Sequence, residues 1–175
     1  MPDRVFNVLF LCTGNSARSI LAESALRRMS GDRFRAFSAG SAPKGAINPD
    51  AIRLLDRIGY PTEGLRSKSW DEYSAAEAPR MDFVFTVCDD AAGEICPLWP
   101  GRPMSAHWGI EDPSRLAGTE IERERAFVQA LRYLENRLSL FIALPLDTLE
   151  ATALTAKLRE IGQSDGASAR RPKVA

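Results

Sequence analysis

Apolar and polar positions fall into blocks along the chain, and the blocks have the lengths of strands and helices. Residues 5–11 form a run of apolar, β-prone side chains interrupted only by Asn7, which is typical of a buried parallel strand. Further strands are predicted at 33–39, 81–88 and 104–108. The segment 81–88 is nearly continuous in β-forming residues, which favours a central position in the sheet.

Segments with helical periodicity separate these strands. Asn48 followed by Pro49 predicts an N-cap and a first helical turn, and Gly59 predicts the end of that helix. Helices are predicted over residues 19–30, 49–58, 70–78, 119–141 and 146–161. Their predicted inward-facing positions include Ile52, Leu55, Ile58, Ile121, Val128, Leu131, Leu134 and Leu138.

This alternation of strands and helices is typical of an α/β sandwich. We expect three layers around a central four-stranded parallel sheet, with the main domain at residues 1–142. Residues 143–162 predict an additional amphipathic helix that packs on this domain or on a partner subunit. Residues 163–175 are polar and are expected to be disordered. Residues 89–103, which are rich in glycine and proline, predict a mobile loop.

Composition narrows the classes of function. The 175 residues contain 23 Lys and Arg against 23 Asp and Glu, so the formal net charge is zero. No basic stripe or acidic tract indicates nucleic acid or an anionic membrane as a partner. The chain lacks a signal-peptide pattern and an apolar stretch of membrane-spanning length. We therefore expect a cytoplasmic protein.

The junction between the first strand and the first helix has the composition of an anion-binding loop. Cys12 ends the strand, and a polar loop leads into a helix that contains Arg18. Free N–H groups and the positive end of a helix dipole meet at such a junction. Gly14 and Asn15 tolerate the positive φ that a tight loop needs. The predicted oxyanion-binding residues are Thr13, Gly14, Asn15, Ser16, Ala17, Arg18 and Ser19.

Cys12 is the candidate nucleophile of this loop. A thiol at a helix N-terminus beside an arginine is expected to have a pKa of roughly 3.5–7.5 instead of about 8.5. Arg18 offers a planar fork for two oxygens of a tetrahedral anion. A core cysteine at the end of a strand is the alternative. A nucleotide-binding loop is excluded because no Gly-Lys-Ser/Thr follows the glycine.

The other two cysteines, Cys88 and Cys96, extend this chemistry. Cys88 also ends a predicted strand, and the carboxyl ends of parallel strands share one edge of the sheet, so Cys88 is expected beside Cys12. Cys96 lies in the predicted mobile loop. The three cysteines and His107 have no close pair, so their spacing argues against a zinc site, and no metal is predicted.

Several motifs together resemble the low-molecular-weight protein tyrosine phosphatase superfamily, and within it the arsenate reductase branch. The resemblance covers about residues 4–142. The motifs are Cys12-Thr13-Gly14-Asn15-Ser16-Ala17-Arg18-Ser19, Ala22-Glu23, Ser38-Ala39-Gly40, the segment from Val87 to Pro97, and the segment from His107 to Pro113. The resemblance implies a phosphatase-like fold and identifies Asp112 as the general acid.

The resemblance also implies a cysteine relay that reduces arsenate to arsenite. Cys12 attacks arsenate held by Arg18, Cys88 then attacks Cys12, and Cys96 finally attacks Cys88. Two sulfurs bridge only when their Cα atoms come within about 7 Å, so residues 89–95 are expected to move. No bound cofactor is expected. Thioredoxin is the implied reductant, and glutaredoxin with glutathione is the alternative.

Two other functions are compatible with these residues. The first is a low-molecular-weight protein tyrosine phosphatase that uses the Cys12 and Arg18 loop with Asp112. The second is a non-catalytic arsenite or zinc binder, which leaves Arg18 unexplained. Some relatives bind potassium through Asn, Glu, Ser and Asp residues. Because Ser69 stands where the Asp is expected, no cation is predicted.

Overall fold

The computed structural model describes residues 4–93, 97 and 99–168. Its central sheet has four parallel strands in the order β2-β1-β3-β4, which confirms the expected four-stranded parallel sheet. The strands are β1 (Phe6–Leu11), β2 (Phe34–Ala39), β3 (Phe83–Thr86) and β4 (Met104–His107). Because β1 and β3 are adjacent and parallel, their carboxyl ends lie side by side.

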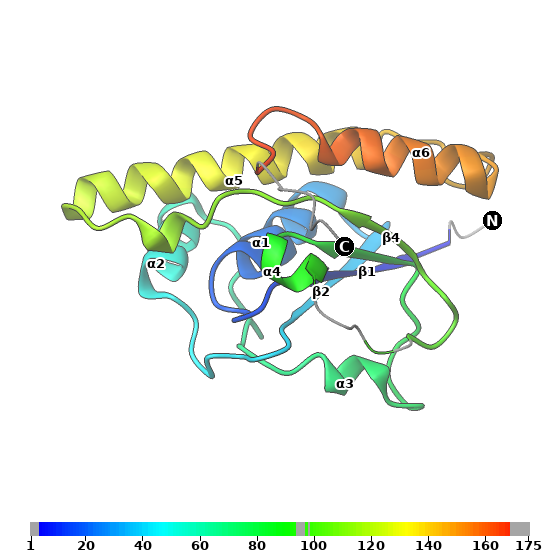
Figure 1. The fold of residues 1–175 in the computed structure, drawn as a ribbon, viewed down its shortest axis with the longest axis horizontal. Coiled ribbons are helices and arrows are strands. Elements are labelled where there is room, and N and C mark those ends of the chain that lie inside the picture. The colour runs from blue at the N-terminus through cyan, green and yellow to red at the C-terminus, as the bar shows by residue number, and fades with distance from the viewer. Residues whose placement is uncertain (1–3, 94–96, 98, 169–175) are drawn as a thin grey trace.

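Helices flank the sheet on both faces (Figure 1). They are α1 (Arg18–Ser30), α2 (Pro49–Ile58), α3 (Asp71–Ser74), α4 (Asp89–Gly93), α5 (Glu120–Ile142) and α6 (Ala151–Gly162), with a 3-10 turn at Pro113–Arg115. Alternate residues of β1 face opposite layers. Val8 and Phe10 pack in the core under α1, α5 and α6, whereas Leu9 and Leu11 face the smaller cluster beside α3.

Aromatic rings fill much of the larger core. Phe141 of α5 packs edge-on against Phe85 of β3, with ring centroids 5.3 Å apart. Phe85 in turn stacks on Trp108, just after β4, at a centroid distance of 3.7 Å. Edge-to-face pairs such as Phe85 and Phe141 stabilise a core beyond their buried area. They fix α5 across the strands whose ends carry the candidate site.

The additional helix packs on its own chain. Helix α6 contacts β4 and α5, and the indole N–H of Trp108 donates a hydrogen bond of 2.9 Å to the carbonyl oxygen of Leu158. Arg137 of α5 is completely buried. Its guanidinium donates to four carbonyl oxygens, those of Tyr133, Gly162, Ser164 and Asp165, at 3.0–3.4 Å. One cation therefore satisfies the carbonyl groups at the C-terminus of α6.

Several local expectations differ from the structure. Residues 89–93 form α4 instead of a mobile loop, because Asp89 and Asp90 favour the positive end of a helix and alanines follow. Ile121 and Ile58 were predicted to face inward, but their side chains are 63% and 39% exposed. Each lies near a helix end, where the helix extends past the layer that it covers.

Residues beyond α6 also form backbone hydrogen bonds with the segment that follows β4. Residues 163–168, which the sequence assigns to a disordered tail, are described and hydrogen bonded, and Ala167 bridges to Ile110. Residues 169–175 lie outside the described part. None of the described helices combines the length and apolarity that crossing a membrane would require.

The structure predicts that Arg137→Met lowers the free energy of unfolding by about 2–4 kcal/mol, because buried carbonyl groups lose a charged donor. Urea unfolding followed by circular dichroism measures this change. Arg159→Met on the exposed face of α6 is the matched control and should change stability by about 0.5 kcal/mol or less. Equal stabilities of the two variants would contradict the role of Arg137.

Candidate functional site

The site lies where β1 and β3 end. Cys12 follows β1, and its backbone N–H donates to the carbonyl oxygen of Ala39 at 3.2 Å, which continues the β1–β2 pairing. The loop then turns into α1, which starts at Arg18 without a side-chain cap at its N-terminus. Its first N–H groups have no intrahelical partners. The backbone therefore forms the predicted junction of strand, loop and helix.

Asn15 holds the loop in shape. It has a positive φ of 41°, and its side chain is completely buried. The amide donates to the hydroxyl groups of Ser19 at 2.8 Å and Ser38 at 3.0 Å, and its oxygen accepts the backbone N–H of Lys68 at 2.9 Å. The Asn15 and Ser19 side chains thus stabilise the loop from behind, and neither lines the cavity in front of the loop.

Two glycines permit close packing around the loop. Gly14 was expected to take a positive φ but does not; it is covered instead by the Lys44 side chain, whose Cε lies 3.2 Å from where a Cβ would be. A Cβ on Gly40 would lie 2.4 Å from the carbonyl oxygen of Thr13 and 2.6 Å from that of Cys12. Gly40 is therefore required for β2 to support the loop.

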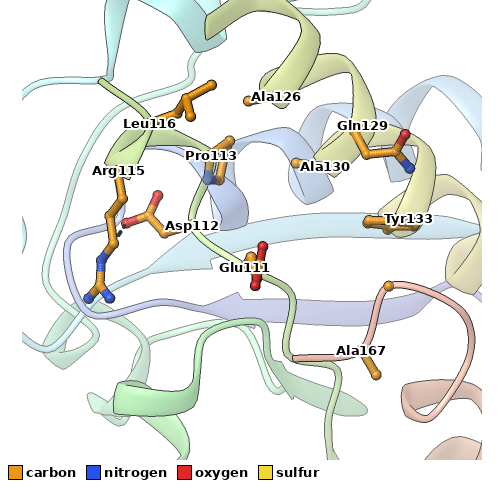
Figure 2. A pocket seen from close by; sticks show the side chains of 11 residues that line it. Glu111, Asp112, Pro113, Arg115, Leu116, Ala126, Gln129, Ala130, Tyr133 and Ala167 are labelled. Carbon is orange, nitrogen blue, oxygen red and sulfur yellow. Dashed lines mark ion pairs between the residues drawn. The ribbon is translucent and has the colours of Figure 1, made fainter. Parts of the chain in front are cut away.

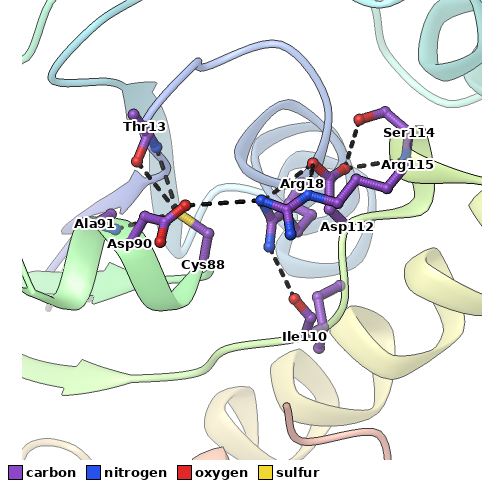
Figure 3. A network of polar contacts seen from close by, with 9 residues as sticks. All are labelled: Thr13, Arg18, Cys88, Asp90, Ala91, Ile110, Asp112, Ser114 and Arg115. Carbon is purple, nitrogen blue, oxygen red and sulfur yellow. Dashed lines mark hydrogen bonds and ion pairs between the residues drawn. The ribbon is translucent and has the colours of Figure 1, made fainter. Parts of the chain in front are cut away.

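Arg18 and Asp112 meet at the rim (Figure 3). One terminal nitrogen of Arg18 donates to the carbonyl oxygen of Ile110 at 2.9 Å, and the other lies 3.4 Å from Asp112 Oδ2. Arg18 Nε is buried and has no hydrogen-bond partner among the described residues. The guanidinium therefore keeps unused donor capacity beside the loop.

Asp112 is ionised in this state. Burial by itself raises the pKa of Asp112, but the Ser114 hydroxyl and the charges of Arg18 and Arg115 outweigh burial and hold this pKa below its usual value. The Ser114 hydroxyl donates to Asp112 Oδ1 at 2.7 Å. A general acid has to be protonated before it acts, so an anion in the loop would first have to draw Arg18 away and raise this pKa.

Cys88 lies beside the loop with its sulfur surrounded by donors. The backbone N–H groups of Thr13 and Ala91 point at Cys88 Sγ from 3.3 Å and 3.4 Å (Figure 3). Both Cys12 and Cys88 are buried and have free thiols. Because α4 begins directly after Cys88, its Ala91 N–H reaches back to the sulfur.

The two sulfurs share a proton. The side-chain hydrogen bond with Cys88, together with burial, raises the pKa of Cys12 well above its ordinary value, against the smaller opposing effects of Arg18 and the Gly14 N–H. The same hydrogen bond lowers the pKa of Cys88 to about 6, helped by the Ala91 and Thr13 N–H groups. The expectation of a low pKa at Cys12 is therefore wrong for this state, because the sequence does not show that Cys88 competes for the charge.

A cavity of about 420 Å³ opens over the loop and brings most of the predicted residues together. Its lining includes predicted residues, namely Cys12, Thr13, Gly14, Ser16, Ala17, Arg18 and Asp112, and unpredicted ones, namely Ala42, Lys44, Asp90, Ser114 and Arg115. Asp90 and Arg115 directly follow the Cys88-Asp89 and Asp112-Pro113-Ser114 motifs, a proximity that could have indicated them. Cys96, the third predicted thiol, lies outside the described residues.

Two buried charged residues, Glu23 and Lys68, help to decide whether a cation can bind behind the loop. Glu23 is buried, and burial raises its pKa against the opposing charges of Lys68 and Arg27. Lys68 is also buried, and its ammonium donates to the carbonyl oxygen of Arg66 at 2.9 Å. Because Lys68 already supplies a positive charge near Glu23, and Ser69 replaces an acidic ligand, these residues do not fit a bound potassium ion. The described part of the chain contains no cluster of three or more His, Cys, Asp or Glu side chains arranged for a metal.

Comparison with solved structures supports the same architecture. An arsenate reductase from Archaeoglobus fulgidus superposes with a TM-score of 0.61 at 26% identity, covering 78% of this chain and 99% of the other. A thioredoxin-dependent arsenate reductase from Corynebacterium glutamicum gives a TM-score of 0.54 at 23% identity, covering 81% and 65% of the two chains. The likeness to the second protein concerns the fold alone.

Sequence comparison extends over most of the chain. An arsenate reductase from Bacillus subtilis strain 168 is 37% identical over 134 residues, which cover 77% of this chain and 93% of the relative. The family described as "Low molecular weight phosphotyrosine protein phosphatase" matches residues 7–154. These residues include β1 from Asn7 onward, β2 to β4, the loop after Cys12 and Asp112. The chain therefore belongs to the low molecular weight phosphotyrosine protein phosphatase family.

Proposed function

We propose that this protein reduces arsenate to arsenite. The observation that carries the proposal is the pair of buried free thiols, Cys12 and Cys88, that share one proton beside the Arg18 loop. Hydrolysis of a phosphate ester requires one nucleophilic thiol. Reduction of arsenate requires two electrons, which two adjacent thiols supply as they form a disulfide. Relatives named arsenate reductase, such as that of Bacillus subtilis, support this choice.

The first step is attack by Cys12 on arsenate in the loop. The substrate is held by the N–H groups of the loop and by Arg18. An anion that engages Arg18 weakens its contact with Asp112, and the added negative charge raises the pKa of Asp112 so that it takes up a proton. The proton of the Cys12 thiol passes to an oxygen of the bound arsenate dianion as the Cys12 S–As bond forms. An As–O bond breaks, and its oxygen leaves as water with the proton of Asp112.

The second step is attack by the Cys88 thiolate on Cys12 Sγ. A sulfur–sulfur bond forms, the S–As bond breaks, and its electron pair remains on arsenic, which is reduced from As(V) to As(III). Before arsenate reacts, the pKa of Cys88 is about 6, so Cys88 enters the relay as the thiolate, which is the nucleophile in thiol–disulfide exchange. The Thr13 and Ala91 N–H groups still stabilise this thiolate once Cys12 is bonded to arsenic. Arsenite then leaves the loop.

The third step transfers the disulfide outward. Cys96 attacks Cys88 Sγ, a Cys88–Cys96 disulfide forms, and Cys12 leaves as a thiolate ready for the next cycle. An external dithiol then reduces that disulfide. We propose thioredoxin for this role, in keeping with the fold neighbour described as thioredoxin-dependent, and glutaredoxin with glutathione is the alternative.

The alternative function is hydrolysis of phosphotyrosine with Cys12, Arg18 and Asp112. The family match favours it, since the family is described as a phosphatase. The cavity over the loop argues against it, because none of its lining residues is aromatic or large and apolar, and an aryl ester needs such a wall. A second thiol beside the nucleophile would also have no step to perform.

The relay predicts that arsenite production with thioredoxin, thioredoxin reductase and NADPH falls by about 100-fold or more in each of Cys12→Ser, Cys88→Ser and Cys96→Ser. Each variant lacks one sulfur that has to carry the electron pair in turn. Multiple-turnover measurement of arsenite is the direct assay. Ser74→Ala, on α3 and away from the loop, is the control and should retain wild-type turnover.

The same variants distinguish the two functions. Hydrolysis of a phosphotyrosine mimic without arsenite formation, retained in Cys88→Ser and Cys96→Ser, would replace the reductase proposal with the phosphatase. Arsenite formation that survives the loss of Cys96 would remove only the third step. Replacing thioredoxin by glutaredoxin and glutathione in the wild-type assay identifies the reductant.

The shared proton predicts a specific titration. In a Cys96→Ser background, one thiolate of the pair should appear with a midpoint near pH 6, the pKa of Cys88, and should be lost below that pH. Adding Cys12→Ala removes the donor, so the midpoint should rise toward the ordinary value of about 8.5. Ultraviolet thiolate absorbance measures both. An unchanged midpoint in the double variant would show that Cys12 does not stabilise the Cys88 thiolate.

A further inference from the structure

The chain beyond α6 returns to the candidate site. Ala167 forms an antiparallel bridge with Ile110, and the backbone N–H of Ser168 donates to the carbonyl oxygen of Gly109 at 3.0 Å. Together with α5 and the Asp112 segment, Gly166 and Ala167 line a cavity of about 550 Å³ (Figure 2). The family match ends at residue 154, so this contact is made by a part of the chain that the family does not describe.

The same C-terminal segment also contacts Asp89, the residue after Cys88. The Ser168 hydroxyl donates to Asp89 Oδ1 at 2.8 Å, and His107 Nε2 lies 2.7 Å from the same oxygen. On the other side of the ring, His107 Nδ1 lies 2.7 Å from the Thr86 hydroxyl. A neutral ring satisfies all partners when Nε2 carries the proton for Asp89 and Nδ1 accepts from Thr86.

Gly109 and Arg137 support the positions of the Ser168, His107 and Asp89 side chains. A Cβ on Gly109 would lie 2.5 Å from His107 Nε2, 2.5 Å from Ser168 Oγ and 2.7 Å from Asp89 Oδ1, so only glycine allows the three side chains to meet. The buried Arg137 holds the carbonyl groups of Ser164 and Asp165, which fixes the path toward Ser168. The Ser168–Asp89 contact therefore does not depend on one surface hydrogen bond alone.

We propose that Ser168 and His107 are positioning residues that act through Asp89 as a latch on α4. While both hydrogen bonds hold Asp89, α4 stays wound and its Ala91 N–H remains on Cys88 Sγ. The inference rests on the proposed relay, in which Cys88 has to bridge to Cys96, eight positions along the chain. In this proposal, α4 (Asp89–Gly93) has to unwind before Cys88 can bridge to Cys96.

The latch gives the relay an order. In the reduced protein, Cys88 is held by α4 beside Cys12, where the second step needs it, and is kept from an early disulfide with Cys96. Once Cys88 has attacked Cys12, its sulfur no longer carries the negative charge that the Ala91 N–H stabilises. The state in which Asp89 is held and α4 is wound is then less strongly favoured over the unwound state. Release of Asp89 allows the third step.

The test is the equilibrium between the Cys88–Cys96 dithiol and its disulfide in a glutathione redox buffer. A Cys12→Ser background leaves these two thiols alone, and each disulfide formed converts one oxidised glutathione to two reduced molecules. In that background, Ser168→Ala removes one hydrogen bond to a charged group from the reduced state. The equilibrium constant for disulfide formation should rise about fivefold, equivalent to about 20 mV in reduction potential.

Ser168→Thr keeps the hydroxyl and should restore the wild-type constant. Hydrogen exchange of the Ala91 amide is the second measurement and should be about fivefold faster in Ser168→Ala. Equal constants and equal exchange in Ser168→Ala and the parent would overturn the latch while leaving the relay intact. If no Cys88–Cys96 disulfide forms at any buffer composition, the relay fails instead, and faster exchange at Ala91 would still support the hold of Ser168 on α4.

Discussion

One negative charge shared between two buried sulfurs is the interaction on which the site depends. Cys12 and Cys88 lie at the ends of adjacent parallel strands, so the sheet itself brings them together. Two thiolates so close and so buried would repel each other and lose hydration, and the second proton is therefore hard to remove. The N–H groups of Thr13 and Ala91 favour the charge on Cys88. A thiolate is thus ready on Cys88, the residue that attacks Cys12 in the proposed relay.

The surrounding structure serves to keep this arrangement rigid while leaving room for an anion. Asn15 and Gly40 support the loop from behind through hydrogen bonds and close packing, and the cavity is left in front. Arg18 is held at the rim by Ile110 and Asp112. The Ser114 hydroxyl and the charge of Arg18 keep Asp112 ionised. In the proposed mechanism, an anion that engages Arg18 raises the pKa of Asp112 so that Asp112 can act as an acid. Binding and protonation are therefore linked through one guanidinium.

The C-terminal part of the chain contributes to both stability and the site. Arg137 gathers the carbonyl groups at the end of α6, and Trp108 ties α6 to the end of β4. These contacts are costly to build, since they bury a full positive charge among neutral groups. They direct the C-terminal segment toward Asp89. Asp89 follows Cys88, whose sulfur is bonded first to Cys12 and then to Cys96 in the proposed relay. The additional helix is in this way joined mechanically to the segment that moves in the proposed relay.

The sequence by itself determined the sheet, the loop and the position of the candidate nucleophile. Apolar periodicity and the Asn48 and Gly59 helix signals depend on local backbone preferences, which are present in the chain before it folds. The strand–loop–helix junction with Cys12 and Arg18 is local in the same sense. Parallel pairing then made it possible to expect Cys88 at the same edge of the sheet.

Only the tertiary structure decided the charges and the long-range contacts. Which sulfur holds the proton depends on the distance between Cys12 and Cys88 and on two backbone donors, the N–H of Thr13 in the loop and that of Ala91 in α4. The ionisation of Asp112 depends on the nearby Ser114 hydroxyl and also on Arg18, which comes from a distant part of the chain. The contacts of Lys68, Arg137 and Ser168 join residues far apart in sequence, and no periodic pattern encodes them. Electrostatic and hydrogen-bonding effects of this kind follow from spatial proximity, which exists only once the chain has folded.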